Sequence, residues 1–85
     1  MSINFGKKFK KQYEKSDPKI KKAFDKRFDL FLQDPFYPLS DNHLLTGEYH
    51  GKRSIDITGD WRAIYSENGG NITFELLGTH SQLYK

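Results

Sequence analysis

The sequence predicts an α+β fold in which a short N-terminal strand and two α-helices precede a small, mainly antiparallel sheet. Apolar residues recur at helical spacing in the first part of the chain, and strand-like alternation with turn signals fills the second part. Helices followed by such a meander are expected to pack on one face of the sheet. We expect the 85 residues to form a single domain over 1–85.

The N-terminal part carries the helical signals. Residues 3–5 alternate apolar and polar and predict a short strand, and residues 7–15 place two aromatic side chains four apart opposite lysines. An Asp-Pro pair at 17–18 is a favourable helix start, an N-cap acceptor followed by proline. The helix that it begins should end at the second Asp-Pro pair, 34–35, because a residue before proline avoids the helical conformation.

The C-terminal part reads as strands. Residues 36–45 are rich in Pro, Ser, Asp and Asn and predict an irregular connection. Strands are expected over 49–58, 61–65 and 72–77, where apolar and polar residues alternate. The Asn-Gly-Gly-Asn sequence at 68–71 predicts a tight hairpin between the last two.

Composition excludes several classes of function. There is no cysteine, so disulfides, thiolate nucleophiles and cysteine-based zinc sites are excluded. We see no membrane-length apolar run and no signal peptide, and we therefore expect a cytoplasmic protein with no membrane partner. Residues 1–27 have a net charge of +7 and residues 28–85 a net charge of −4. The basic part suits a polyanion or an acidic protein segment slightly better than a merely solvated helix face.

No cofactor motif is present, and the three histidines are too scattered to predict a metal site. What remains is a set of polar residues that a short sheet could bring together: His43, Asp56, Asp60, Arg62 and His80. Histidine, carboxylate and arginine are the groups needed for acid–base cleavage of a phosphodiester. Taken from spacing alone the alternatives stay open, since Asp60 could serve a turn and Arg62 could pair with Glu75.

Four stretches of the second half resemble the RelE/ParE toxin superfamily, and within it the YafQ-type branch of bacterial type II toxin–antitoxin systems. They are His-Leu-Leu-Thr-Gly-Glu-Tyr from residue 43, Gly-Lys-Arg from 51, Gly-Asp-Trp-Arg-Ala-Ile-Tyr from 59 and Gly-Thr-His-Ser-Gln-Leu-Tyr from 78. The match covers residues 43–84, with the motifs in order, and the N-terminal half matches in plan.

The resemblance implies a ribosome-dependent endoribonuclease that cuts messenger RNA and is neutralised by a cognate antitoxin. Operator DNA would be bound only through the antitoxin complex, and no cofactor is implied. Residue by residue, His80 matches the family's catalytic histidine, a general acid for the leaving 5′ oxygen. Asp60 and His43 match residues that help activate the 2′-hydroxyl or orient the substrate.

The remaining matches imply RNA contacts. Tyr84 falls where an aromatic ring positions a base, and Trp61 fits either base stacking or, better, the core. Arg62 occupies a place where these toxins often carry arginine. Phosphate contacts are expected from Lys52 and Arg53, and ribosomal RNA contacts from the lysine-rich helix, through Lys7, Lys8, Lys10 and Lys11.

The chain departs from the family's pattern at two positions. Asp56 stands where the branch often has histidine, and Leu76 where it often has arginine. Asp56 could replace the histidine as a base if its pKa were raised, and Arg62 could supply the missing positive charge. Two other functions therefore remain open: a ParE-like toxin that inhibits DNA gyrase without enzymatic activity, or a degenerate toxin that only binds its antitoxin.

Overall fold

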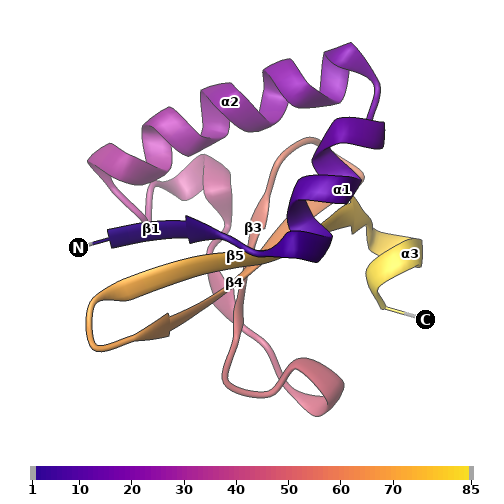
Figure 1. The fold of residues 1–85 in the computed structure, drawn as a ribbon. Coiled ribbons are helices and arrows are strands. Elements are labelled where there is room, and N and C mark those ends of the chain that lie inside the picture. Colours follow the sequence, from indigo (N-terminus) through magenta and orange to yellow (C-terminus); the bar gives the residue numbers. More distant parts are fainter. Residues whose placement is uncertain (1, 85) are drawn as a thin grey trace.

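The computed structural model describes residues 2–84, which form three α-helices, two short 3-10 helices and a five-stranded sheet (Figure 1). The elements follow one another along the chain as β1 (Ser2–Phe5), α1 (Lys7–Lys15), α2 (Pro18–Gln33), η1 (Pro38–Ser40), β2 (His43–Leu44), η2 (Gly47–Tyr49), β3 (Arg53–Asp56), β4 (Trp61–Asn68), β5 (Asn71–Thr79) and α3 (His80–Leu83). The predicted α+β class, with its N-terminal strand and two helices, is confirmed. No helix within residues 2–84 is long and apolar enough to span a membrane.

The strand order is β1-β5-β4-β3-β2, and every pairing is antiparallel except that of β1 with β5. The β4–β5 hairpin turns at Gly69 and Gly70, whose positive φ angles of 58° and 84° are those of the predicted tight turn. A register shift between Ile64 and Tyr65 leaves Glu75 as an extra residue on β5. The sheet is therefore a mixed one, with its first strand pairing parallel to its last.

One face of the sheet is covered by α1 and α2 (Figure 1), and the main core lies between them. Helical spacing directs Phe9 of α1 and Phe24 and Phe31 of α2 onto the sheet, where all three are buried. Phe74 lies at the centre, fully buried, with ring centroids of neighbouring aromatic residues 5.4 to 5.9 Å away. Aromatic packing of this density fixes the position of β5 against both helices.

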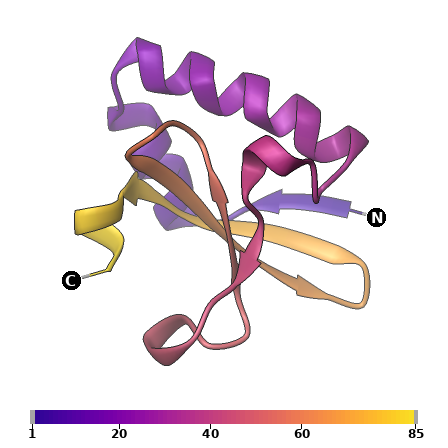
Figure 2. The ribbon, with the colours of Figure 1, turned by 180° about the vertical axis from the view of Figure 1, so that it is seen from behind.

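The opposite face of the sheet carries a second, smaller apolar cluster. Leu45, Ile64 and Leu83 are its buried members, and Tyr49, Leu76 and Tyr84 pack against it. Because side chains alternate along a strand, Arg62 lies on this face with Ile64, while Ala63 joins the main core. Figure 2 shows the connection that carries η1 and β2 in the foreground, with α3 at the end of β5. The second cluster thus anchors α3 close to β4.

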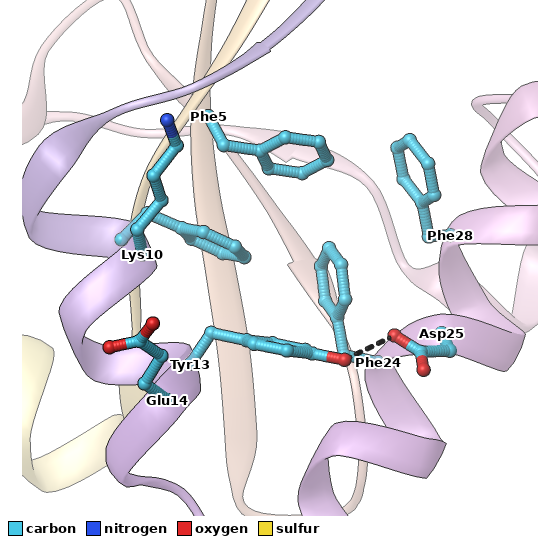
Figure 3. A pocket seen from close by; sticks show the side chains of 8 residues that line it. Phe5, Lys10, Tyr13, Glu14, Phe24, Asp25 and Phe28 are labelled. Atoms are coloured by element: carbon cyan, nitrogen blue, oxygen red, sulfur yellow. Dashed lines mark hydrogen bonds between the residues drawn. The ribbon is translucent and has the colours of Figure 1, made fainter.

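An open apolar groove of about 490 Å³ remains between β1, α1 and α2 (Figure 3). The rings of Phe5, Phe24 and Phe28 line it, and the Tyr13 hydroxyl crosses it to donate a hydrogen bond of 2.8 Å to Asp25. This bond ties α1 to α2. The hydrogen bond to Asp25 raises the pKa of Tyr13, and burial and the negative charge of Asp25 raise it further.

The helices match the sequence predictions, and the second half differs in detail. The predicted irregular connection 36–45 contains η1 and the two-residue strand β2, and the strand expected over 49–58 begins only at Arg53. Residues 47–49 form η2 instead, since Gly47 and Gly51 adopt positive φ angles that interrupt an extended chain. The last two strands are longer than predicted, because hairpin pairing extends beyond the apolar residues to the turn.

Candidate active site

A cavity of about 390 Å³ opens on the face of the sheet opposite α1 and α2. It brings together side chains from β2, β4 and α3, three elements that are distant in the sequence. Its polar lining includes three of the predicted catalytic residues, His43, Arg62 and His80, together with the predicted RNA-binding residue Tyr84. The full lining is Asp41, His43, Leu44, Leu45, Thr46, Arg62, His80 and Tyr84.

Arg62 is held in place by contacts at two of its guanidinium nitrogens, Nη1 and Nε. Its Nη1 donates to the backbone carbonyl oxygens of Thr58, Gly59 and Trp61, at 3.1, 3.2 and 3.1 Å. Its Nε lies 2.9 Å from Oδ1 of Asp56, the residue opposite Arg62 on β3. Arg62 therefore pairs with Asp56, whereas Glu75, the alternative partner, pairs with Lys52.

Asp56 lies behind Arg62, with its side chain 27% exposed. The contact is an ion pair with poor hydrogen-bond alignment, since Oδ1 is buried and accepts no well-directed hydrogen bond within residues 2–84. Burial raises the pKa of Asp56 above the usual aspartate range, and the Arg62 charge opposes this only in part. The direction is the one that a base at this position would need.

His80 begins α3 and is placed by a capping box. The Thr79 hydroxyl accepts from the backbone N–H of Gln82 at 3.2 Å, and the Gln82 side chain accepts from the backbone N–H of Thr79 at 2.9 Å. The backbone N–H of His80 donates to the carbonyl oxygen of Asp60 at 2.9 Å, which ties α3 to the start of β4. The backbone of His80 is thus fixed while its side chain stays exposed.

Tyr84 lines the cavity next to His80. Its ring centroid lies 4.7 Å from that of His80 and 6.0 Å from that of Tyr49. Tyr49 is itself held by a hydrogen bond of 2.9 Å from its hydroxyl to the Leu83 carbonyl. Tyr84 therefore contacts the catalytic candidate directly, and its hydroxyl is buried.

His43 enters the cavity from β2, next to a residue that sequence reasoning missed. Nδ1 of His43 lies 2.8 Å from the backbone carbonyl oxygen of Asp41, a residue with a left-handed φ of 44°. An aspartate at the end of the Pro-Leu-Ser turn, two residues before the histidine, was the signal available in the sequence.

The other predicted site residues lie outside the cavity lining. Asp60 is exposed at the start of β4 and reaches the site through its backbone carbonyl. Trp61 points to the opposite face and packs against the main core. Lys52 is paired with Glu75 across the sheet. Arg53 donates from Nε to the Asn42 side chain at 2.8 Å, and its guanidinium lies 5.1 Å from the centre of the Phe36 ring.

The four α1 lysines predicted to contact RNA lie in the helix layer, on the other side of the sheet from the cavity. All four are exposed, and Lys10 borders the groove of Figure 3; the group comprises Lys7, Lys8, Lys10 and Lys11. Leu76, at the position where an arginine is frequent in the resembling toxins, pairs across the sheet with Ile64 and packs on the second cluster. Leu76 therefore lies on the same face of the sheet as Arg62.

Comparison with known proteins assigns the fold and the family. The family model described as "Bacterial toxin of type II toxin-antitoxin system, YafQ" matches residues 1–85. No curated protein matches the chain.

Solved structures agree in fold. The structure is similar to YafQ from E. coli strain BL21(DE3), with a TM-score of 0.78, 22% identity and coverage of 99% of this chain and 98% of that one. It is also similar to a YoeB/ParE toxin from Agrobacterium tumefaciens, with a TM-score of 0.76, 20% identity and coverage of 94% and 99%. YafQ in the E. coli DinJ-YafQ complex matches with a TM-score of 0.69, 24% identity and coverage of 99% and 98%. Because the family model matches residues 1–85, this chain belongs to the YafQ family of bacterial toxins of type II toxin–antitoxin systems.

Proposed function

We propose that this toxin is a ribosome-dependent endoribonuclease that cuts messenger RNA by acid–base catalysis without a metal ion. The observation that supports the proposal best is the convergence of His43, Arg62 and His80 on one open cavity. Two imidazoles and a guanidinium around one space are the groups that a phosphodiester substrate requires.

The proposed step uses the substrate's own 2′-hydroxyl, and it therefore requires RNA. His43, as the base, removes the proton from the 2′-hydroxyl while this oxygen attacks the neighbouring phosphorus. The bond from phosphorus to the 5′ oxygen breaks, and His80, as the acid, protonates the leaving oxygen. The products are a 2′,3′-cyclic phosphate and a free 5′-hydroxyl; His43 has gained one proton and His80 has lost one.

Arg62 is proposed to stabilise the charge that develops on the phosphate. Its Nε and Nη1 are occupied by Asp56 and by backbone carbonyls, so the guanidinium is oriented before substrate arrives. Preorganised donors of this kind are worth far more than mobile ones, because they need no reorganisation during the reaction. We assign Asp56 to holding Arg62, with a direct role as base as its alternative.

The remaining RNA contacts are proposals of the same kind. Tyr84, in contact with His80, is placed to support a base beside the scissile bond. Asp60 is proposed to position His80, because its backbone carbonyl oxygen accepts a hydrogen bond from the backbone N–H of His80. Lys52, Arg53, Trp61 and the α1 lysines do not line the cavity, so any RNA contact that they make would lie outside it.

The proposal includes a protein partner. E. coli YafQ has been solved in complex with DinJ, its partner in a toxin–antitoxin complex. We infer that this toxin likewise binds a cognate antitoxin. Its basic N-terminal part, with a net charge of +7 over residues 1–27, favours an acidic segment in that partner.

The test is cleavage of a defined messenger RNA, with and without ribosomes, by the wild-type toxin, His80→Ala and His50→Ala. His50 is a matched control, because it is exposed and does not line the cavity. The proposal expects ribosome-dependent cuts from the wild type and from His50→Ala. For His80→Ala we expect a loss of about 10²- to 10⁴-fold.

The competing functions predict different results when the protein is expressed in cells without an antitoxin. A gyrase inhibitor would induce the DNA damage response before protein synthesis falls, and a degenerate toxin would not arrest growth at all. A folded wild-type protein that arrests growth without cutting RNA would refute the endoribonuclease reading.

A further inference from the structure

The cavity contains a contact that decides which nitrogen of His43 carries a proton. Nδ1 of His43 lies 2.8 Å from the backbone carbonyl oxygen of Asp41. A carbonyl oxygen can only accept a hydrogen bond, so Nδ1 must be the protonated nitrogen in this contact. The lone pair of the neutral ring is then on Nε2.

We propose that Asp41 is a positioning residue that holds His43 in its Nδ1–H tautomer and so presents Nε2 as the basic nitrogen in the cavity. The role in catalysis rests on the proposed function, while the tautomer itself does not. In the opposite tautomer Nε2 would carry the proton, and it could not accept another from a 2′-hydroxyl.

The backbone of Asp41 makes this contact through an uncommon conformation. Its φ of 44° and ψ of 49° are left-handed, and its N–H donates to the Pro38 carbonyl at 3.1 Å to close η1. Aspartate, asparagine and glycine tolerate this region, whereas β-branched residues do not. The reversal of the chain at Asp41 is what places its carbonyl beside a ring two residues ahead.

Both flanks of the contact are fixed. The Asn42 amide donates to the Pro35 carbonyl and to the Tyr65 hydroxyl, each at 2.8 Å, and Asn42 Oδ1 accepts from Arg53. His43 itself is paired with Ser54 in the sheet. With residues 42 and 43 anchored in this way, the geometry at residue 41 controls the ring.

The carboxylate of Asp41 has a lesser part. Its Oδ2 is 4.0 Å from Nδ1 of His43, beyond hydrogen-bond distance. We therefore assign the orientation to the backbone carbonyl. It follows that Asp41→Asn and Asp41→Gly, which keep the carbonyl and tolerate the left-handed conformation, should preserve the tautomer. Asp41→Val should lose it.

Long-range ¹H–¹⁵N NMR spectra of the labelled full-length toxin report the tautomer directly. The His43 signals are assigned by comparison with His43→Gln, and exposed His50 serves as an internal reference in the same spectrum. At a pH where the imidazoles are neutral, the wild type, Asp41→Asn and Asp41→Gly should show Nδ1–H at His43. Asp41→Val should show a mixture or Nε2–H, with an unchanged circular dichroism spectrum.

Messenger RNA cleavage on ribosomes then tests the consequence. Asp41→Asn and Asp41→Gly should cut within a few-fold of the wild type, and Asp41→Val should cut at least about tenfold more slowly. Nε2–H in the wild type would overturn the inference, and so would an unchanged tautomer in a folded Asp41→Val. If the tautomer is as stated but the wild type cuts no RNA, the inference stands and the proposed function fails.

Discussion

Replacing Arg62 by alanine is expected to lower both the stability of the toxin and its activity. The side chains of Arg62 and Asp56 are only 18% and 27% exposed, and Nε of Arg62 lies 2.9 Å from Oδ1 of Asp56. Removing one partner of a fully buried pair costs about 3–5 kcal/mol. Partial exposure lets water replace some of the lost contacts, and we therefore expect a loss of about 2–3 kcal/mol.

Urea unfolding followed by circular dichroism measures this loss of free energy. In thermal unfolding the same loss should appear as a fall in Tm of about 10–20 °C for a chain of this size. Combining Arg62→Ala with Asp56→Asn should recover part of the loss, because no unpaired carboxylate is left behind. Ribosome-dependent cleavage by Arg62→Ala should fall about 10²- to 10³-fold.

Two controls separate the effects. Arg62→Lys keeps the positive charge but lacks the Nη1 group that donates to three carbonyls, so its cleavage should lie between that of the wild type and that of Arg62→Ala. Lys22→Ala removes an exposed charge and should change neither property. An Arg62→Ala protein that unfolds within about 0.5 kcal/mol of the wild type and cuts normally would refute this account of Arg62.

Three further predictions concern the rest of the molecule. Phe74→Ala, at a fully buried position, should cost about 3–5 kcal/mol of unfolding free energy. The control Leu39→Ala, at a side chain that is 64% exposed, should cost under about 0.5 kcal/mol. A loss below about 1 kcal/mol at Phe74 would contradict the packing described. Thr79→Ala, which opens the capping box, should slow RNA cleavage while Thr79→Ser should not, and equal rates would show that the cap does not position His80. Burial raises the pKa of Glu75, but the hydrogen bond from Lys52 and further contacts more than reverse this, so that its pKa in the fold is lowered from 4.5. The contribution of Glu75 is then present above pH 4.5 and lost as the pH falls through the folded pKa, and Glu75→Gln should be less stable than the wild type at neutral pH, by up to about 1 kcal/mol, and equal to it in acid.

Local signals in the sequence were enough for most of the fold. The Asp-Pro pairs set both ends of α2, where Asp17 accepts from the Lys19 N–H at 2.8 Å, and the two glycines at 69–70 set the hairpin. β2 could not be predicted, because two residues carry no periodicity and are held only by pairing with β3. The parallel pairing of β1 with β5 likewise depends on tertiary contacts rather than on either segment alone.

The same distinction applies to the candidate site. Four of the predicted site residues were identified from their residue types and from their places in the sequence motifs, and all four line the cavity: His43, Arg62, His80 and Tyr84. The contacts of Lys52 and Arg53 with Glu75 and Asn42 join distant parts of the chain, so no local pattern reveals them. Asp41 was not predicted as a site residue, because the role proposed for it depends on the backbone conformation at this residue and not on a sequence motif.

The parallel pairing of β1 with β5 also sets the order in which the protein can assemble during its own synthesis. Ser2–Phe5 are made well before their partners Asn71–Phe74, because more than sixty residues separate the two strands in the sequence. Until then the apolar side chains of α1 and α2 cannot pack against Phe74, and His80, which follows β5 directly, is not positioned. A growing chain therefore cannot complete the sheet, the main core or the cavity until residues 71–84 have been made, and any activity that needs the cavity can begin only then.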